Sequence, residues 1–187
     1  MPDFKNVLFT RHSTRDFSNK PIANEDLDFI LKAGQIAPSC QNKQPWRFIV
    51  VNDYDKIKNI EFKSGILGKV NFFLKSAPII IIACAHPKKS CKINHQEYYL
   101  VDTAIAFQQM MLAAWSKGIG SCWMAAFNEK KIRKLFDIPK KIRIVSLSPF
   151  GYPKGKKSIY SKLVSNFAKS KKRKKIKEIV SFNKWNL

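Results

Sequence analysis

Hydrophobic positions along the chain follow helical and extended patterns in turn. Between residues 97 and 117 apolar side chains surround almost the whole circumference of a predicted helix, and Gly118 is its natural end. A helix that is apolar on all sides must be central, so we expect it to be buried against its own sheet and against a second subunit. A continuous apolar run at 79–84 predicts a strand that is covered on both faces.

A second helix is predicted over residues 24–36, where the apolar positions keep to one face. Asn24 is its expected N-cap, and Pro38 ends it because proline disfavours a helical residue before it. Weaker patterns predict strands at 46–51 and 143–148, a helix at 129–136, and helical or irregular structure at 56–60 and 68–75. Strands interspersed with helices indicate an α/β or α+β domain.

Composition indicates a folded protein and excludes a membrane-spanning one. The chain has 187 residues, of which 45% are hydrophobic, enough for a sizeable core in one domain. No apolar run has the length of a membrane span, and the amino terminus lacks a basic-then-apolar signal pattern. The expected location is therefore the cytoplasm.

The net charge of +22 is unevenly distributed. Half of it comes from eleven Lys and Arg residues between positions 154 and 177, a stretch without Asp or Glu. A nucleic-acid-binding module is the function that such a charge suggests. A lysine-biased proteome explains the charge at least as well, because lysine is a point charge and a poor reader of bases. We therefore expect no nucleic-acid partner and keep this function as a distant alternative.

The cysteines give little indication of cross-linking. The four are widely spaced and form no C-x-x-C pair, so we expect neither a disulfide framework nor a zinc site. Cys91 and His95 stand four residues apart, but two ligands are too few for a structural zinc ion. No metal is expected.

Two polar clusters carry candidate chemistry. Residues 11–17 place Arg11, Ser13 and Arg15 close together, and two guanidinium groups with a hydroxyl suit a phosphate. A solvated basic turn explains this first cluster equally well. Residues 37–46 form the second cluster, in which hydroxyl and amide groups lie between two prolines and suit the edge of a flat heterocycle. An ordinary polar loop is the alternative there, but the pair together predicts a nucleotide-like cofactor.

In order and spacing, the chain resembles the nitroreductase family of flavin mononucleotide (FMN) enzymes. The matching motifs are R-x-S-x-R-x-F at 11–17, A-P-S-x-x-N-x-Q-P-W at 37–46, the hydrophobic helix with Asp102 and Gln108, G-I-G-S-C-W at 118–123, and F-G-Y-P at 150–153. Each motif alone is weak, but the ordered set is specific.

The resemblance implies an α+β sandwich with a mixed, mostly antiparallel sheet flanked by helices, in an entwined homodimer with FMN at the subunit interface. The first cluster would hold the phosphate, ribityl and pyrimidine side of FMN, the second would approach the flavin from the partner, and 122–124 would line the buried face of the ring. The implied cofactor-binding residues are Arg11, His12, Ser13, Arg15, Pro38, Ser39, Asn42, Gln44, Asn71, Cys122, Trp123, Met124, Gly151, Lys154, Lys156 and Lys157. The sequence leaves open which of the three lysines reaches the phosphate.

The activity implied by the resemblance is NAD(P)H-dependent reduction of nitroaromatics, quinones or related small acceptors. The hydride would pass through flavin N5 in a ping-pong reaction, because both substrates would use one pocket. Arg15 is the expected support for negative charge on the ring, and no side chain stands out as a general acid or base. A flavin-storing, flavin-sensing or FMN-fragmenting protein of the same fold is the alternative.

The resemblance ends before the basic carboxyl-terminal segment. We expect an FMN-binding domain at 1–165 and an extension at 166–187. Apolar residues Ile179, Val180, Phe182 and Trp185 close the extension, so we expect it to wrap the partner subunit.

Overall fold

The computed structural model describes residues 3–64, 73–155 and 172–185. Contacts divide the chain into two units, Met1–Lys154 and Gly155–Leu187. The boundary predicted between residues 165 and 166 lies outside the described residues and stays a prediction. In the described residues, no helix combines the length and the apolar character needed to cross a membrane.

The first unit is built on a four-stranded sheet in the order β1-β2-β6-β5. The strands are β1 (Trp46–Val51), β2 (Ile79–Ala85), β6 (Arg143–Gly151) and β5 (Gly120–Ser121). All neighbouring strands pair antiparallel, and a separate parallel bridge joins Ser13 to Ser121. Each residue of β2 is buried, as its continuous apolar run predicts.

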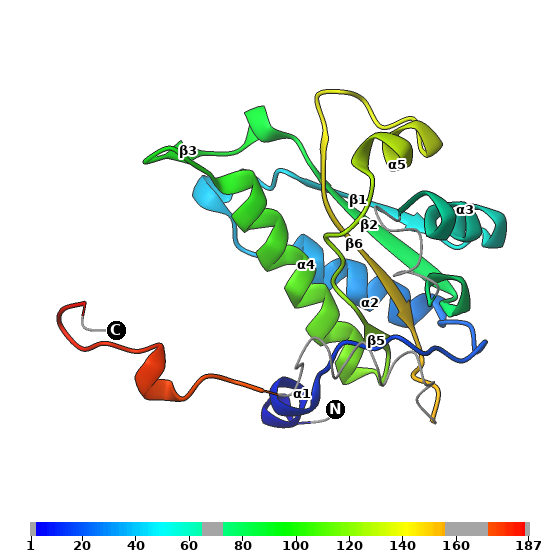
Figure 1. Ribbon diagram of the computed structural model, residues 1–187, viewed down its shortest axis with the longest axis horizontal. Coiled ribbons are helices and arrows are strands. Elements are labelled where there is room, and N and C mark those ends of the chain that lie inside the picture. The colour runs from blue at the N-terminus through cyan, green and yellow to red at the C-terminus, as the bar shows by residue number, and fades with distance from the viewer. Residues whose placement is uncertain (1–2, 65–72, 156–171, 186–187) are drawn as a thin grey trace. The chain divides into compact units, whose positions relative to one another are not determined.

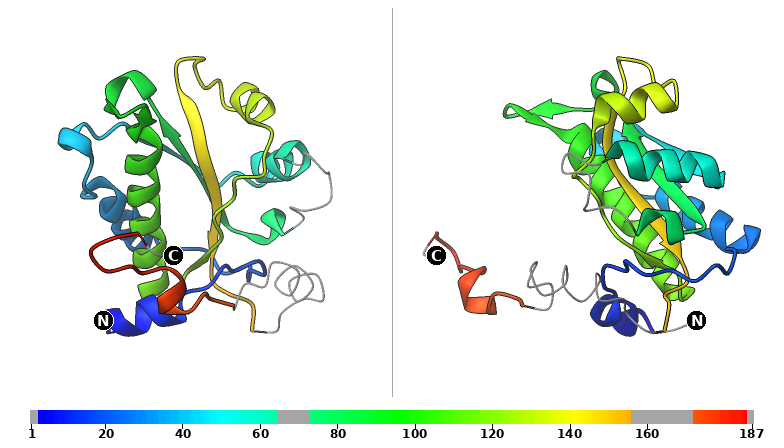
Figure 2. Two further views of the ribbon diagram at one scale, coloured as in Figure 1. Left: turned by 60° about the vertical axis from the view of Figure 1, so that its left-hand side comes forward. Right: turned by 45° about the vertical axis from the view of Figure 1, so that its right-hand side comes forward.

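Helices cover both faces of the sheet (Figures 1 and 2). The helices α2 (Asn24–Gln35) and α4 (Tyr98–Ser116) lie on one face, and α3 (Tyr54–Ser64) and α5 (Glu129–Leu135) lie on the other. Gly34 lets α2 approach α4 closely, because a Cβ there would lie 2.6 Å from the Met110 sulfur. The mostly antiparallel sheet between helices confirms the predicted α+β class.

The remaining elements are short. They are α1 (Phe4–Thr10), the 3-10 turns η1 (Cys40–Asn42), η2 (Leu74–Ser76) and η3 (Pro87–Lys89), and the hairpin of β3 (Lys92–Ile93) and β4 (Gln96–Glu97). The patterns did not predict α1, β5 or this hairpin, because two to seven residues are too few to establish a period. Asn24 is not the N-cap of α2: that position belongs to Ala23, whose methyl group accepts no hydrogen bond.

The second unit has one described turn, η4 (Ile176–Glu178), in which the Lys175 backbone N–H donates to the Glu178 carboxylate at 2.6 Å. Its apolar residues are exposed, with Phe182 and Trp185 each more than 80% accessible.

Phe107 of α4 joins the main core between helix and sheet. It is fully buried, its ring stacks on Phe48 at 6.1 Å between centroids, and it meets the rings of Trp123 at 5.4 Å and Phe150 at 6.2 Å. This residue therefore joins α4 to β1, to β6 and to the segment that follows β5.

We predict that Phe107→Ala lowers the free energy of unfolding by about 3–5 kcal/mol, because the truncation leaves a cavity among these rings. Thermal or urea unfolding measures the loss. Tyr54→Ala, at a side chain that is 61% exposed, serves as the control and should change stability by less than about 0.5 kcal/mol. Equal stability of Phe107→Ala and the wild type would contradict the packing described here.

Candidate functional site

The first polar cluster lies alongside the edge strand β5 and the end of β6. After α1 the chain is extended, and the Thr14 N–H donates to the Ser121 carbonyl at 2.9 Å. Phe17 is buried and forms an antiparallel bridge with Pro153. Thr14 also fills the space over Gly120, where a Cβ would lie 2.7 Å from the Thr14 Cβ. Backbone pairing with Ser121 and with Pro153 thus fixes the segment that carries both arginines.

The backbone bridge between Ser13 and Ser121 lays the first cluster beside the residues that leave β5, among them Cys122. Burial raises the pKa of the Cys122 thiol, while Arg15, Ser13 and Arg11 act in the opposite direction. The raised pKa keeps the thiol protonated, so Cys122 is a packed, unreactive group.

The other two members of the 122–124 stretch have different environments. Met124 is buried and pairs through its backbone with Leu147, whereas Trp123 is 38% exposed and meets Phe107 edge to face. The stretch therefore presents a partly exposed aromatic side chain that packs against α4.

The turn after β6 completes this end of the molecule. Ser18 N–H donates to the Tyr152 carbonyl at 2.9 Å, and Lys154 N–H donates to the Asp16 carbonyl at 3.0 Å. Gly151 packs so closely that a Cβ would lie 2.6 Å from Pro78 and 3.1 Å from Phe17. Lys154 is thereby placed next to the first cluster. The predicted site residues Asn71, Lys156 and Lys157 lie outside the described residues.

His12 is held against α4. Its ring meets Trp115 edge to face at 4.8 Å, its Nδ1 lies 3.2 Å from the Thr10 carbonyl, and the Trp115 indole donates to the Thr10 hydroxyl at 2.8 Å. These contacts attach the start of the cluster to the carboxyl-terminal end of α4.

The second polar cluster is a strained loop between α2 and β1. Gln41, Asn42 and Gln44 all have positive φ angles, between 46° and 54°, a conformation that costs a non-glycine residue free energy. The loop is held internally, since the Ser39 hydroxyl accepts from the Gln44 N–H at 3.0 Å and the Gln44 amide donates to Asn42. Asn42 and Gln44 are exposed at its tip.

A buried carboxylate on α4 holds the start of this loop. Asp102 is 2% exposed; its Oδ1 accepts from the Cys40 N–H at 2.9 Å and its Oδ2 accepts from the Ser90 hydroxyl at 2.8 Å. Asp102 belongs to one of the matching sequence motifs, but its role as an anchor of this loop was not predicted. The signal was present, because Asp102 is the one charged residue in the 19 of α4, and a buried charge needs hydrogen-bond partners.

Cys40 and Cys91 form a disulfide across a Cα–Cα distance of 6.2 Å, so the expectation of no disulfide was wrong. Its cause is the topology. Trp46 pairs with Ala85 in the antiparallel ladder of β1 and β2, so the loop before β1 and the loop after β2 leave the sheet side by side. The two cysteines stand 51 positions apart in the sequence, and this spacing gave no indication of their pairing. Cys84 and Cys122 are free and buried.

Within one chain the two clusters lie at opposite ends of the molecule. Asp102 holds the second cluster and Trp115 holds the first, and thirteen helical steps between them correspond to about 20 Å. The strand β2 gives the same separation. Ile79, at its start, pairs with Phe150, and Ala85, at its end, pairs with Trp46; the six residue-to-residue steps between them correspond to about 20 Å. One chain therefore does not bring the predicted site residues together.

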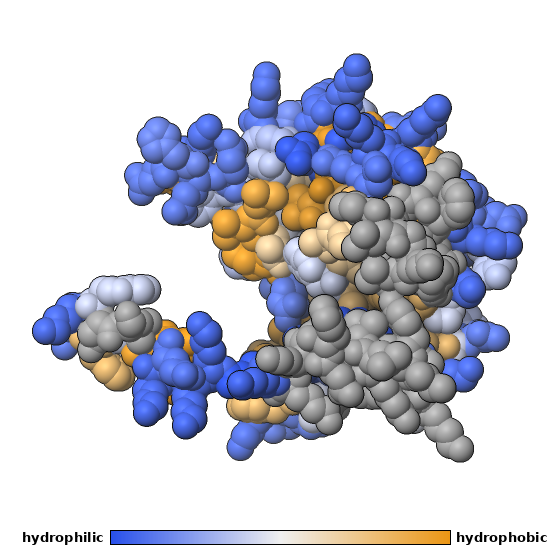
Figure 3. Space-filling model, viewed as in Figure 1, coloured by the Kyte–Doolittle hydropathy of each residue, from blue (hydrophilic) through white to orange (hydrophobic). Residues whose placement is uncertain are grey.

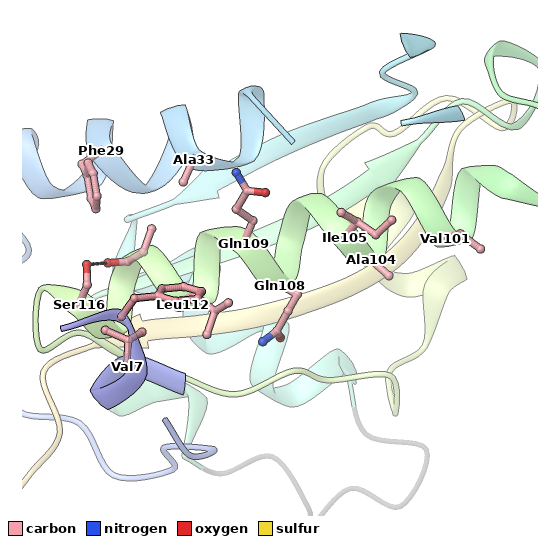
Figure 4. A pocket seen from close by; sticks show the side chains of 12 residues that line it. Val7, Phe29, Ala33, Val101, Ala104, Ile105, Gln108, Gln109, Leu112 and Ser116 are labelled. Carbon is pink, nitrogen blue, oxygen red and sulfur yellow. Dashed lines mark hydrogen bonds between the residues drawn. The ribbon is translucent and has the colours of Figure 1, made fainter. Parts of the chain in front are cut away.

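An apolar groove runs between these ends along α4 (Figure 4). It encloses about 980 Å³ and is lined by residues of α1, α2 and α4, among them Phe29, Ala33 and Leu112. Val101 and Ile105, which also line the groove, and the neighbouring Leu100 are more than 40% exposed. Hydrophobic side chains also gather in the middle of the face drawn in Figure 3. Such an exposed patch marks a contact surface.

Comparison with known proteins identifies the family. A model of the nitroreductase family matches residues 8–152, a range that contains both polar clusters and Asp102. The chain belongs to the nitroreductase family.

Relatives and solved nitroreductase structures agree with this assignment. The chain is 36% identical over 164 residues to an Archaeoglobus fulgidus protein provisionally named NADH dehydrogenase/NAD(P)H nitroreductase, covering 86% of this chain and 91% of the relative. A nitroreductase family protein from Clostridium novyi NT has a TM-score of 0.78 at 36% identity, covering 82% of this chain and 86% of that one. An FMN-dependent nitroreductase from Clostridium difficile R20291 has a TM-score of 0.77 at 28% identity, covering 97% of this chain and 99% of that one.

We predict that Gly120→Ala lowers the free energy of unfolding by about 1–3 kcal/mol, because its methyl group would overlap Thr14. It should also speed hydrogen exchange at the Thr14 amide, which bonds to Ser121. Thermal unfolding and exchange mass spectrometry measure the two effects. Gly155→Ala is the matched control, since a Cβ at Gly155 meets nothing within 4 Å. If both variants match the wild type, Thr14 does not press on β5 as described.

Proposed function

We propose that this nitroreductase is an FMN-dependent oxidoreductase that uses NAD(P)H to reduce a small acceptor such as a nitroaromatic or a quinone. The observation that carries the proposal is the backbone pairing of Ser13 and Thr14 with Ser121, which lays the segment with both arginines along the stretch that leads to the exposed Trp123. Charged donors beside an aromatic surface suit a ligand with a phosphate at one end and a planar ring at the other.

The donor set fits FMN. Two guanidinium groups and a hydroxyl lie on one extended segment, and Lys154 is attached to the same segment through its backbone bond to Asp16. A phosphate monoester carries nearly two negative charges and takes several such donors. Arg11, Ser13 and Lys154 would hold the phosphate end, and Arg15 would lie toward the ring.

The separation of about 20 Å between the clusters supports a homodimer in which the sites are shared. If α4 packs on the same helix of a second copy about a two-fold axis, the start of one helix lies near the end of the other. Residues 38–44 of one subunit would then face residues 11–15 of its partner, and the groove along α4 would be covered. The exposed Val101 and Ile105 lie on this face.

The carboxyl-terminal extension belongs to the same proposal. Its exposed Ile179, Phe182 and Trp185 need an apolar surface, and the partner subunit would supply one. The cytoplasmic location stays a prediction from the sequence.

When bound, FMN would supply the hydride-transfer chemistry between the nicotinamide and the acceptor. The protein binds and orients the cofactor, excludes water and places positive charge near the ring. Arg15 is assigned this last role because a guanidinium group near the ring would stabilise negative charge on it. Since both substrates would use one pocket, ping-pong kinetics are expected.

We predict that the purified protein is yellow and oxidises NADH or NADPH when a nitroaromatic or a quinone is added. Absorption spectra during anaerobic titration with each nucleotide, followed by mixing with each acceptor, measure both half-reactions. A colourless protein that takes up no added FMN would overturn the proposal. Flavin that binds but is reduced by neither nucleotide would favour the storage, sensing or FMN-fragmenting alternative.

Subunit complementation tests the shared site. We predict that Arg11→Gln/Arg15→Gln and Asn42→Ala/Gln44→Ala each bind FMN at least about tenfold more weakly than the wild type, because each removes hydrogen bonds to the cofactor. A mixed dimer, isolated through two different affinity tags, should regain one tight site of its two. In the mixed dimer, one of the two shared sites would contain all four substitutions, and the other site would contain only wild-type residues. A mixed dimer without a tight site would mean that each site lies within one chain.

A further inference from the structure

We propose that the Cys40–Cys91 disulfide is a reversible redox latch that fixes the conformation of the loop at 38–45. The disulfide form would hold this loop ready for FMN, and the dithiol form would release it and weaken FMN binding. The consequence for FMN rests on the function proposed above, whereas the latch itself depends on the geometry of this chain.

The disulfide joins two loops at their bases. Besides the bond itself, the His86 N–H donates to the Pro45 carbonyl at 3.0 Å, and the Tyr98 N–H donates to the Cys91 carbonyl at 3.0 Å. The second of these bonds closes the hairpin that follows Cys91 and fixes that cysteine at the start of α4. Cys40 is thus attached directly to a rigid support, whereas residues 41–44 are held by hydrogen bonds within the loop and from Arg47.

The residues directly after Cys40 have the backbone geometry that needs such a support. Gln41 and Asn42 have φ angles of 49° and 54°, and Gln44 has a φ of 46°. Each left-handed non-glycine residue costs free energy and persists when its surroundings over-determine it. No other three described residues lie in this conformation within so short a stretch. The loop therefore has lower-energy conformations available once a tie is removed.

Cys40 is held by the disulfide and by a hydrogen bond from its N–H to Asp102, and the hydrogen bond does not depend on redox state. The Asp102 carboxylate binds the Cys40 N–H and the Ser90 hydroxyl, so it joins the same two loops by hydrogen bonds. Reduction would remove the covalent tie and leave the carboxylate in place. We therefore expect a looser loop on a folded domain and not a general loss of structure.

Accessibility separates this pair from the other cysteines. Cys40 and Cys91 are partly exposed, whereas Cys84 and Cys122 are buried. Burial raises the pKa of Cys84 to about 12 and also raises that of Cys122, so neither offers a thiolate for exchange. Among the described residues, Cys40 and Cys91 are therefore the cysteines that an external thiol can reach.

The redox step is thiol–disulfide exchange with an external dithiol. A thiolate of the dithiol attacks one sulfur of the pair, a mixed disulfide forms, and the other cysteine leaves as a thiolate that takes up a proton. The second thiol of the reagent then displaces the first cysteine. Two electrons and two protons pass to Cys40 and Cys91, and the dithiol becomes a disulfide.

The test equilibrates the full-length protein in buffers with different ratios of reduced to oxidised dithiothreitol. Alkylation followed by mass spectrometry measures the thiols at 40 and 91. Amide hydrogen exchange at 41–44 measures the loop without FMN, and fluorescence titration measures the Kd for FMN. We expect both thiols to appear together and reversibly, faster exchange at 41–44 in the dithiol form, and a Kd about tenfold higher, because fewer molecules hold the binding conformation.

The variant Cys40→Ser/Cys91→Ser is the control for effects of the reagent. It should show the fast exchange and the weak binding of the dithiol form in every buffer, with no response to dithiothreitol. A disulfide that stays closed in the most reducing buffer would overturn the latch, and so would equal exchange at 41–44 in both forms. If exchange changes with redox state but neither form binds FMN, the latch stands and the proposed function fails. If both forms bind FMN equally, the assigned effect of the latch on binding is wrong.

Discussion

The central helix α4 sets the distance between the two polar clusters of this nitroreductase-family protein. Asp102 near its start holds the strained loop, and Trp115 near its end holds the segment that carries the arginines. Since a helix is rigid along its axis, these two attachments cannot approach one another within a chain. Phe107 between them fixes the same helix to the sheet. A ligand site that uses residues from both ends of α4 therefore depends on what packs against this helix.

The sequence predicted the long elements well, because each has enough residues to show a period. The continuous apolar run of β2 and the almost wholly apolar α4 appear in the structure within one or two residues of the predicted bounds. Short elements such as β5 escaped prediction. Its two residues are held by Ser13 and β6, and those partners are far away in the sequence. The N-cap of α2 was missed because the backbone, and not the side chain of Asn24, determines where the helix begins.

For the candidate site, the residue types allowed us to predict which residues could bind a ligand, but not which of them lie close together in one chain. The segment with both arginines pairs with β5 through Ser13, whereas the loop containing Ser39 and Asn42 is held near the other end of α4 by Asp102. The disulfide is the clearest miss. It depends on the register of β1 against β2, and cysteine spacing contains no information about strand register. Asp102 was recognisable in principle, since a single charge on a buried helix requires partners.

The bridge between Ser13 and Ser121 also affects aggregation. Outer strands expose unpaired N–H and C=O groups, and a second chain can add to them. Here the extended segment after α1 covers the outer side of β5, with Thr14 donating to Ser121. The segment that carries the arginines therefore covers an edge of the sheet and also forms part of the candidate ligand site. Its detachment would uncover an open sheet edge that another chain could join, so the residues of the candidate ligand site also protect that edge.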